Sequence, residues 1–133
     1  MTERETLKEP TARRLVNWLL VVIYASFIFI LSSLSSPGAS FLPTFYHSDK
    51  LIHFVEFFIF GFLLYRALNE YQEPKKAFMT SFFIVSLYGF TDELHQYIVP
   101  LRSAEALDLL ADSLGGLLGT SFAMAGLRGG SLE

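Results

Sequence analysis

Four long apolar segments dominate the chain, and polar or helix-breaking residues separate them. The apolar segments cover residues 15–34, 51–68, 77–99 and 106–127. Each is close to the ~20 residues that an α-helix needs to cross the hydrocarbon core of a bilayer. The pattern therefore predicts an all-α, polytopic membrane protein whose four transmembrane helices form a bundle.

The composition agrees with this prediction and excludes several other classes of protein. The 133 residues give room for one domain, 52% of them are hydrophobic, and 14 are Phe. Because the chain has no Cys, it forms no disulfide and no cysteine metal site. A net charge of -3 is too small to indicate a nucleic-acid partner.

The polar segments at the two ends suggest a simple domain organisation. We expect a cytoplasmic N-terminal tail at 1–14, a four-helix transmembrane domain at 15–128 and a C-terminal tail at 129–133. A signal peptide is the alternative for the start of the chain, since basic residues precede the first apolar segment. That segment is longer than the ~7–15 apolar residues of a signal peptide, so we interpret it as a retained span.

The basic residues predict the orientation in the membrane. Four spans place the two termini and the 69–76 loop on one side, which carries Arg4, Lys8, Arg13, Arg14, Arg66, Lys75, Lys76 and Arg128. The other side carries only Lys50 and Arg102. Because short cytoplasmic segments are enriched in Lys and Arg, we expect both termini to be cytoplasmic.

Carboxylates interrupt the apolar segments, most clearly at residues 91–96 (TDELHQ) near the end of the third segment. A charge near the bilayer centre costs roughly 2.5–3.5 kcal/mol, so acidic residues there usually face a protein interior or a watery cavity. In the predicted orientation, Glu56, Glu93 and Asp112 each lie about 8–10 Å below the outer membrane boundary. Three helices therefore contribute to one polar layer near the outer leaflet.

Helical spacing connects this polar layer to faces that are rich in small residues. The face of the last segment comprises Asp108, Asp112, Gly115, Gly119 and Ala123. The corresponding face of the third segment comprises Ser86, Gly89, Glu93 and Gln96. Because a GxxxG pattern lets two membrane helices approach closely, we expect these faces to pack inside the bundle.

The charged residues near the helix ends have a second interpretation, as residues exposed to lipid headgroups and water. This shallow group consists of Asp49, Lys50, Glu105 and Asp108, and Asp108 would also act as a helix cap. The deeper acids have no such local reason to be charged, so they favour a functional cluster. For His95, a packing role and a site role both stay open.

Three blocks of the sequence match a known family. They are residues 49–57 (DKLIHFVEF), residues 92–103 with Asp92, Glu93, Gln96 and Arg102, and residues 108–116. In these blocks, which with their spacing cover about residues 49–119, the chain resembles the VanZ-like membrane proteins. Where this family commonly has Gly in the turn after the third segment, the present chain has Leu101.

The resemblance implies a small, multi-pass protein of the bacterial cytoplasmic membrane. The family is named for a member associated with low-level resistance to the glycopeptide teicoplanin. It offers no established catalytic residue to carry over, so a mechanism must come from the polar layer itself. We expect a binding site made of His53, Glu56, Asp92, Glu93, Gln96, Arg102, Asp108 and Asp112.

Several functions are compatible with such a site. The chain lacks Gly-x-Ser-x-Gly, His-Glu-x-x-His and any Cys, which weakens the hypothesis of an enzyme. We favour binding of a membrane lipid or a lipid-linked envelope precursor. The alternatives are an enzyme that uses acidic general acid and base residues on a lipid-linked substrate, and a purely structural role for the layer. We expect no cofactor, although a divalent cation on Asp and Glu oxygens is compatible with the acidic excess.

Overall fold

The computed structural model describes residues 3–34 and 48–129, and within these ranges it contains helices and no strand. The helices are α1 (Glu3–Ser33), α2 (Ser48–Leu68), α3 (Pro74–Ile98) and α4 (Ala106–Gly129). The predicted all-α fold is thereby confirmed for this part of the chain. Two parts of the sequence lie outside the described residues: the helix-breaking residues 35–40, between the first two apolar segments, and residues 130–133 of the predicted C-terminal tail. Because α1 begins at Glu3, the predicted tail at 1–14 is largely helical.

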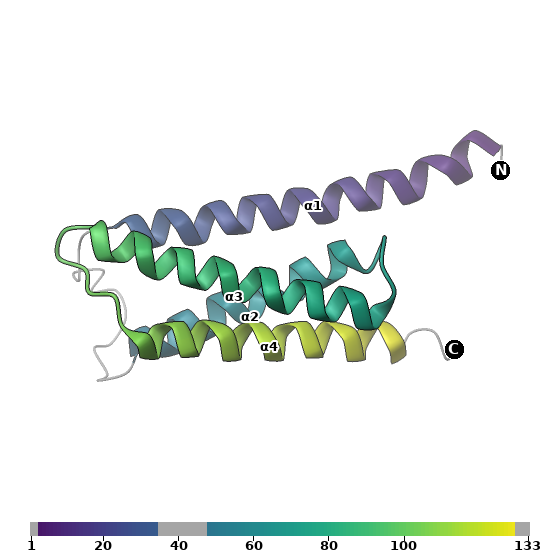
Figure 1. Cartoon of the computed structure of the whole chain (residues 1–133). Helices are drawn as coiled ribbons and strands as arrows, with labels where there is room; N and C mark the ends of the chain where they lie inside the picture. Colours follow the sequence, from purple (N-terminus) through teal and green to yellow (C-terminus); the bar gives the residue numbers. More distant parts are fainter. Residues whose placement is uncertain (1–2, 35–47, 130–133) are drawn as a thin grey trace.

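The four helices run alternately up and down, so the chain termini and the α3–α4 connection lie at opposite ends of the bundle (Figure 1). Figure 1 shows the N and C labels at one end and the connection between α3 and α4 at the other. Helix α4 packs against α2 and α3, whereas α1 lies against α2 and α3 and makes no contact with α4. Helices α2, α3 and α4 therefore contact one another pairwise, and α1 packs against α2 and α3, contributing Val21 and Ile28 to the buried core.

Three of the described helices are long and apolar enough to cross a membrane: Thr11–Ser33, Asp49–Leu68 and Ala106–Gly129. Helix α3 differs because it begins with two lysines and carries Asp92, Glu93, His95 and Gln96 in its last turns. Large apolar side chains such as Ile23, Phe83 and Phe122 are 64–66% exposed on the outer surface. An apolar exterior of this extent, together with these helices, identifies a membrane protein.

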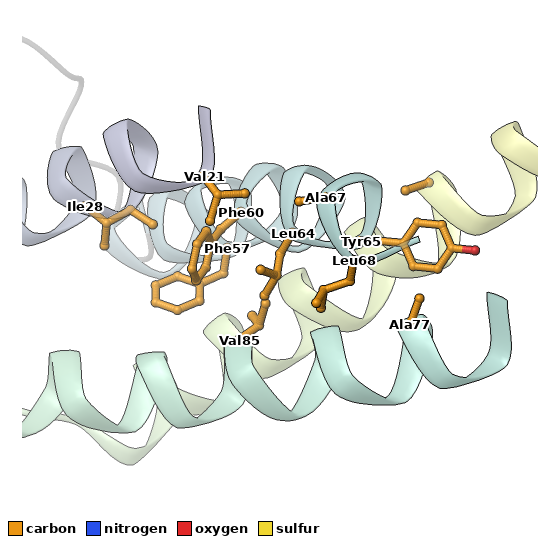
Figure 2. Packing of buried hydrophobic residues seen from close by; sticks show 11 residues of the cluster. Val21, Ile28, Phe57, Phe60, Leu64, Tyr65, Ala67, Leu68, Ala77 and Val85 are labelled. Carbon is orange, nitrogen blue, oxygen red and sulfur yellow. The ribbon is translucent and has the colours of Figure 1, made fainter. Parts of the chain in front are cut away.

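Helix α2 supplies most of the buried apolar cluster, as Figure 2 shows. Phe57, Phe60 and Leu64 follow one another at helical intervals and are at most 3% exposed. The rings of Phe57 and Phe60 meet edge to face with their centroids 6.2 Å apart, a favoured aromatic geometry. Val85 of α3 reaches the same cluster. On α2, the apolar core thus begins at Phe57, after the polar residues near the start of the helix.

Glycines allow α4 to lie directly on the backbone of α2. A Cβ atom on Gly115 would collide with the carbonyl oxygen of Phe54, and one on Gly119 would collide with that of Phe58. Asp112 and Ala123, at the two ends of the same stripe, are 0% and 1% exposed. The prediction that this face of the last segment packs inside the bundle is confirmed.

The turn between α3 and α4 contains one residue in a left-handed conformation. Leu101 has φ 66° and a side chain that is 82% exposed. The backbone N–H of the next residue, Arg102, donates to the carbonyl of Val99 at 3.2 Å and closes the turn. A positive φ favours glycine, and this is the position where the resembling family commonly has Gly. Leu101 therefore adopts a backbone conformation that suits glycine better than leucine.

The end of the bundle opposite this turn is held by arginines of α1 and α2. Arg13 pairs with Glu70 at 2.8 Å, and the guanidinium of Arg14 lies 4.9 Å from the ring centre of Tyr71. Arg66 donates to the side-chain oxygen of the buried Asn17 at 3.3 Å. Basic residues thus concentrate at one end of the bundle.

We expect Gly119→Ala to lower the free energy of unfolding by about 1–3 kcal/mol, because the added methyl group has no room against α2. Gly126→Ala is the matched control, since nothing lies within 4 Å of its Cβ position. That variant should be neutral or stabilising by up to ~1 kcal/mol, as Ala is the better helix former. Unfolding curves in detergent micelles measure both; equal stabilities would contradict close α2–α4 contact.

Candidate functional site

Four buried side chains from three helices meet near the end of the bundle that carries the α3–α4 turn. They are His53 of α2, Asp92 and Glu93 of α3, and Asp112 of α4, which we call the buried cluster. One donor atom of each lies within 4.8 Å of a donor atom of every other. All four residues are at most 7% exposed. The structure thus brings together half of the predicted site residues in one small volume.

The contact between α2 and α4 positions the first pair in this cluster. His53 Nδ1 lies 2.9 Å from Asp112 Oδ1, and the Asp112 side chain is fully buried. Gly89 of α3 makes room for this carboxylate, because a Cβ atom there would lie 3.1 Å from Asp112 Oδ2. The sequence pattern placed Gly89 on the inner face of its helix, but only the structure shows that Gly89 packs against the Asp112 carboxylate.

Two further hydrogen bonds orient the carboxylates of α3. Gln96 Nε2 donates to Asp92 Oδ2 at 3.0 Å, across one helical turn. The backbone N–H of Glu105 donates to Glu93 Oε2 at 3.0 Å and ties the start of α4 to α3. Each carboxylate is therefore fixed by a group that itself stands outside the buried cluster.

Two carboxylate oxygens of the buried cluster have no hydrogen-bond partner among the described residues. They are Glu93 Oε1 and Asp112 Oδ2, and both atoms are buried. A buried polar atom without a partner costs about 1–3 kcal/mol, and more when it is charged. These oxygens therefore indicate where a proton, an ion or a ligand group is needed.

A second acidic group lies nearer the end of the bundle and already contains a cation. The Lys50 ammonium lies 2.7 Å from Glu105 Oε2, 2.8 Å from Asp108 Oδ1 and 3.2 Å from Asp49 Oδ2. We call these four residues the lysine cluster. Asp108 was predicted to belong to the functional site, but its direct partner is Lys50. Sequence reasoning treated Lys50 as an interface residue, although its place three residues before His53 puts both on one face of α2.

Glu56, Arg102 and His95, which the sequence analysis considered for the site, form no hydrogen bond with the described residues of the buried cluster. Glu56, half-buried on α2, and Arg102, half-buried in the α3–α4 turn, form no side-chain hydrogen bond or ion pair with any described residue. His95 points to α1, where its Nε2 lies 2.9 Å from Ser33 Oγ and its ring stacks on Phe29. His95 therefore packs against α1 and forms no hydrogen bond to the described residues of the buried cluster.

A groove on the outer surface reaches the buried cluster from the side of α3 and α4. It has a volume of about 190 Å³. Its lining consists of Phe90, Glu93, Leu94, Tyr97, Ala104, Glu105, Ala106 and Leu109. Glu93 therefore belongs both to the groove wall and to the buried cluster, whereas most of the other lining side chains are apolar.

The fold and this site define a class: a helical membrane protein with buried carboxylates and an imidazole among apolar helices. The VanZ/LLP1 family matches residues 3–127, nearly the whole chain, and the chain therefore belongs to that family. The resemblance seen in residues 49–119 is thereby confirmed. No curated protein and no solved structure shows a significant match.

Lys50→Met should lower the free energy of unfolding by about 1–3 kcal/mol, because the Asp108 carboxylate, with a 6% exposed side chain, would lose its charged partner. Lys76→Met is the control, since Lys76 is exposed at the other end of α3. Adding Asp108→Asn to the Lys50 variant should recover part of the loss. Denaturation in micelles measures the effect, and equal stability of both lysine variants would contradict a structural role for the lysine cluster.

Proposed function

We propose that this protein binds a lipid or lipid-linked amphiphile of the bacterial cell envelope at the groove between α3 and α4. The observation that carries the proposal is the position of Glu93, which lines an apolar surface groove and also belongs to the buried cluster. An amphiphile needs an apolar surface for its chain next to polar groups for its head. The groove and the cluster supply these two environments side by side.

The charges of the site favour a headgroup with hydroxyl or amine donors. Glu93 and Asp112 each keep one buried oxygen without a partner among the described residues, and such oxygens accept hydrogen bonds or bind a cation. Arg102 lies in the adjoining turn and forms no ion pair with the described part of the chain. We propose that its guanidinium binds a phosphate of the same ligand, since a planar fork suits that anion.

The proposal includes four transmembrane spans with both termini in the cytoplasm of a bacterium. Helix α3 is not among the helices apolar enough to count as candidate spans, but its acids Asp92 and Glu93 are buried against the other helices. Arg13, Arg14 and Arg66 lie at the end of the bundle opposite the α3–α4 turn. This distribution supports a cytoplasmic basic end, which would open the groove to the outer leaflet.

A second function is favoured by one specific contact. The imidazole of His53 is held by the buried Asp112 carboxylate at 2.9 Å, and an aspartate in this position orients a histidine that acts as a base. The alternative is therefore an enzyme that acts on a lipid-linked substrate, with His53 or Glu93 moving the proton. Binding stays the primary proposal because no side chain of a recognised nucleophile motif accompanies the pair.

Topology is testable with single cysteines, since the native chain has none. Glu73→Cys and Ser103→Cys place exposed thiols at opposite ends of α3. We expect a membrane-impermeant maleimide to label position 103 in intact cells and position 73 only after permeabilisation. Labelling of position 73 from outside would reverse the orientation and turn the groove toward the cytoplasmic leaflet.

Ligand binding is testable with adjacent tryptophan substitutions. Leu109→Trp should fill the groove and deplete the lipid that co-purifies with the protein in polymer-bounded membrane discs, whereas Leu110→Trp should not, because Leu110 is exposed outside the groove. Mass spectrometry of the extracted lipids measures both, and glycopeptide susceptibility of cells expressing each protein gives a cellular readout. The same lipid profile in the wild type and in Leu109→Trp would exclude the groove as the binding site.

A further inference from the structure

The buried cluster differs from the lysine cluster in one respect that has a chemical consequence. The lysine cluster has three carboxylates around one ammonium, at distances of 2.7–3.2 Å. The buried cluster has three carboxylates and one imidazole, and no Lys or Arg side chain among the described residues lies within 4.0 Å of its carboxylates. The more buried of the two acidic groups therefore contains no Lys or Arg side chain of the described residues among its carboxylates.

We propose that the buried cluster is a binding site for one divalent transition-metal ion, with His53, Asp92, Glu93 and Asp112 as ligands. A dication would balance most of the charge of three carboxylates, which a neutral or singly protonated imidazole does not. It would also supply partners for Glu93 Oε1 and Asp112 Oδ2, the two buried oxygens without any among the described residues. The lysine cluster has no such need, because its ammonium occupies the centre.

The donor set indicates which metal fits. One imidazole nitrogen and three carboxylate oxygens are the ligands of Zn²⁺ and similar ions, whereas Ca²⁺ and Mg²⁺ prefer six or more oxygens. The donors lie within 4.8 Å of one another, and ligand distances of about 2.0–2.2 Å around Zn²⁺ require only a small inward movement of the side chains. His53 Nδ1 and Asp112 Oδ1 share a hydrogen bond at 2.9 Å. To bind one ion they would release the shared proton and move apart slightly, because two ligands on a tetrahedral Zn²⁺ lie ~3.3–3.4 Å apart.

Neighbouring groups hold the proposed ligands in the way that outer groups do in metal sites. Gln96 donates to Asp92, and the Glu105 backbone N–H donates to Glu93. Such hydrogen bonds fix the orientation of ligating carboxylates and leave the remaining oxygens for the metal. Gly89 leaves room for the Asp112 carboxylate, because a Cβ atom there would lie 3.1 Å from Oδ2. This inference is independent of lipid binding, because the metal is tested alone.

The experiment uses the full chain without a polyhistidine tag, purified in micelles, stripped with EDTA and titrated with ZnCl₂. We expect one Zn²⁺ per chain by elemental analysis and a rise in melting temperature, because the ion binds only the folded state. Asp112→Asn and His53→Gln should each weaken Zn²⁺ binding at least ~10-fold. Asp49→Asn is the control in the lysine cluster and should keep the wild-type affinity, since Asp49 neither lines the groove nor contacts a proposed ligand.

Two results would overturn the proposal. One is a folded wild-type chain that neither retains Zn²⁺ nor changes its melting temperature when ZnCl₂ is added. The other is an equal loss of affinity in Asp49→Asn and Asp112→Asn, which would place the ion in the lysine cluster. If Asp112→Asn does not fold, Glu93→Gln replaces it, and the wild-type titration decides the matter without any variant.

Discussion

The backbone contact between α2 and α4 is the constraint on which the rest of the bundle depends. Gly115 and Gly119 let α4 lie against the carbonyl groups of Phe54 and Phe58, so the two axes approach more closely than side chains would allow. At that distance, His53 and Asp112 reach each other at 2.9 Å. The same glycines that pack the apolar part of the bundle therefore set the geometry of its polar end, and α3 closes the site from the third side.

The polar end is divided into two acidic groups that differ in how their charge is balanced. The outer group surrounds Lys50 and is partly exposed, whereas the inner group is almost completely buried. Charges far from water need partners of the opposite sign, and an ammonium on a flexible stem is one solution. No Lys or Arg side chain of the described residues lies within 4.0 Å of the carboxylates of the inner group, so a small ligand or ion is its proposed counterpart.

The apolar segments and their helical periodicity were sufficient to predict the existence of the helices and the faces that pack. They did not predict that α1 begins at Glu3, inside the expected polar tail. The stripe from Asp112 to Ala123 could be predicted because small residues recur at helical intervals, and it is buried as expected. Partners of individual acids could not be predicted, since they depend on helix rotation and side-chain torsions across helices. Asp108 is an example: it shares a face with Asp112, yet its carboxylate binds Lys50. Glu56 was grouped with the site by its depth and its spacing from His53, and Arg102 by its place in the turn beside the layer. Neither criterion specifies a hydrogen-bond partner.

The separation of His53 and Asp112 along the chain has a consequence for biosynthesis. The two partners are 59 residues apart, so α2 is synthesised and reaches the membrane well before the carboxylate on α4 exists. During that interval His53 and Glu56 have neither α3 nor α4 beside them, and α3 itself carries acids that lipid does not accommodate. The contact between His53 and Asp112 can therefore form only after the last helix has been synthesised.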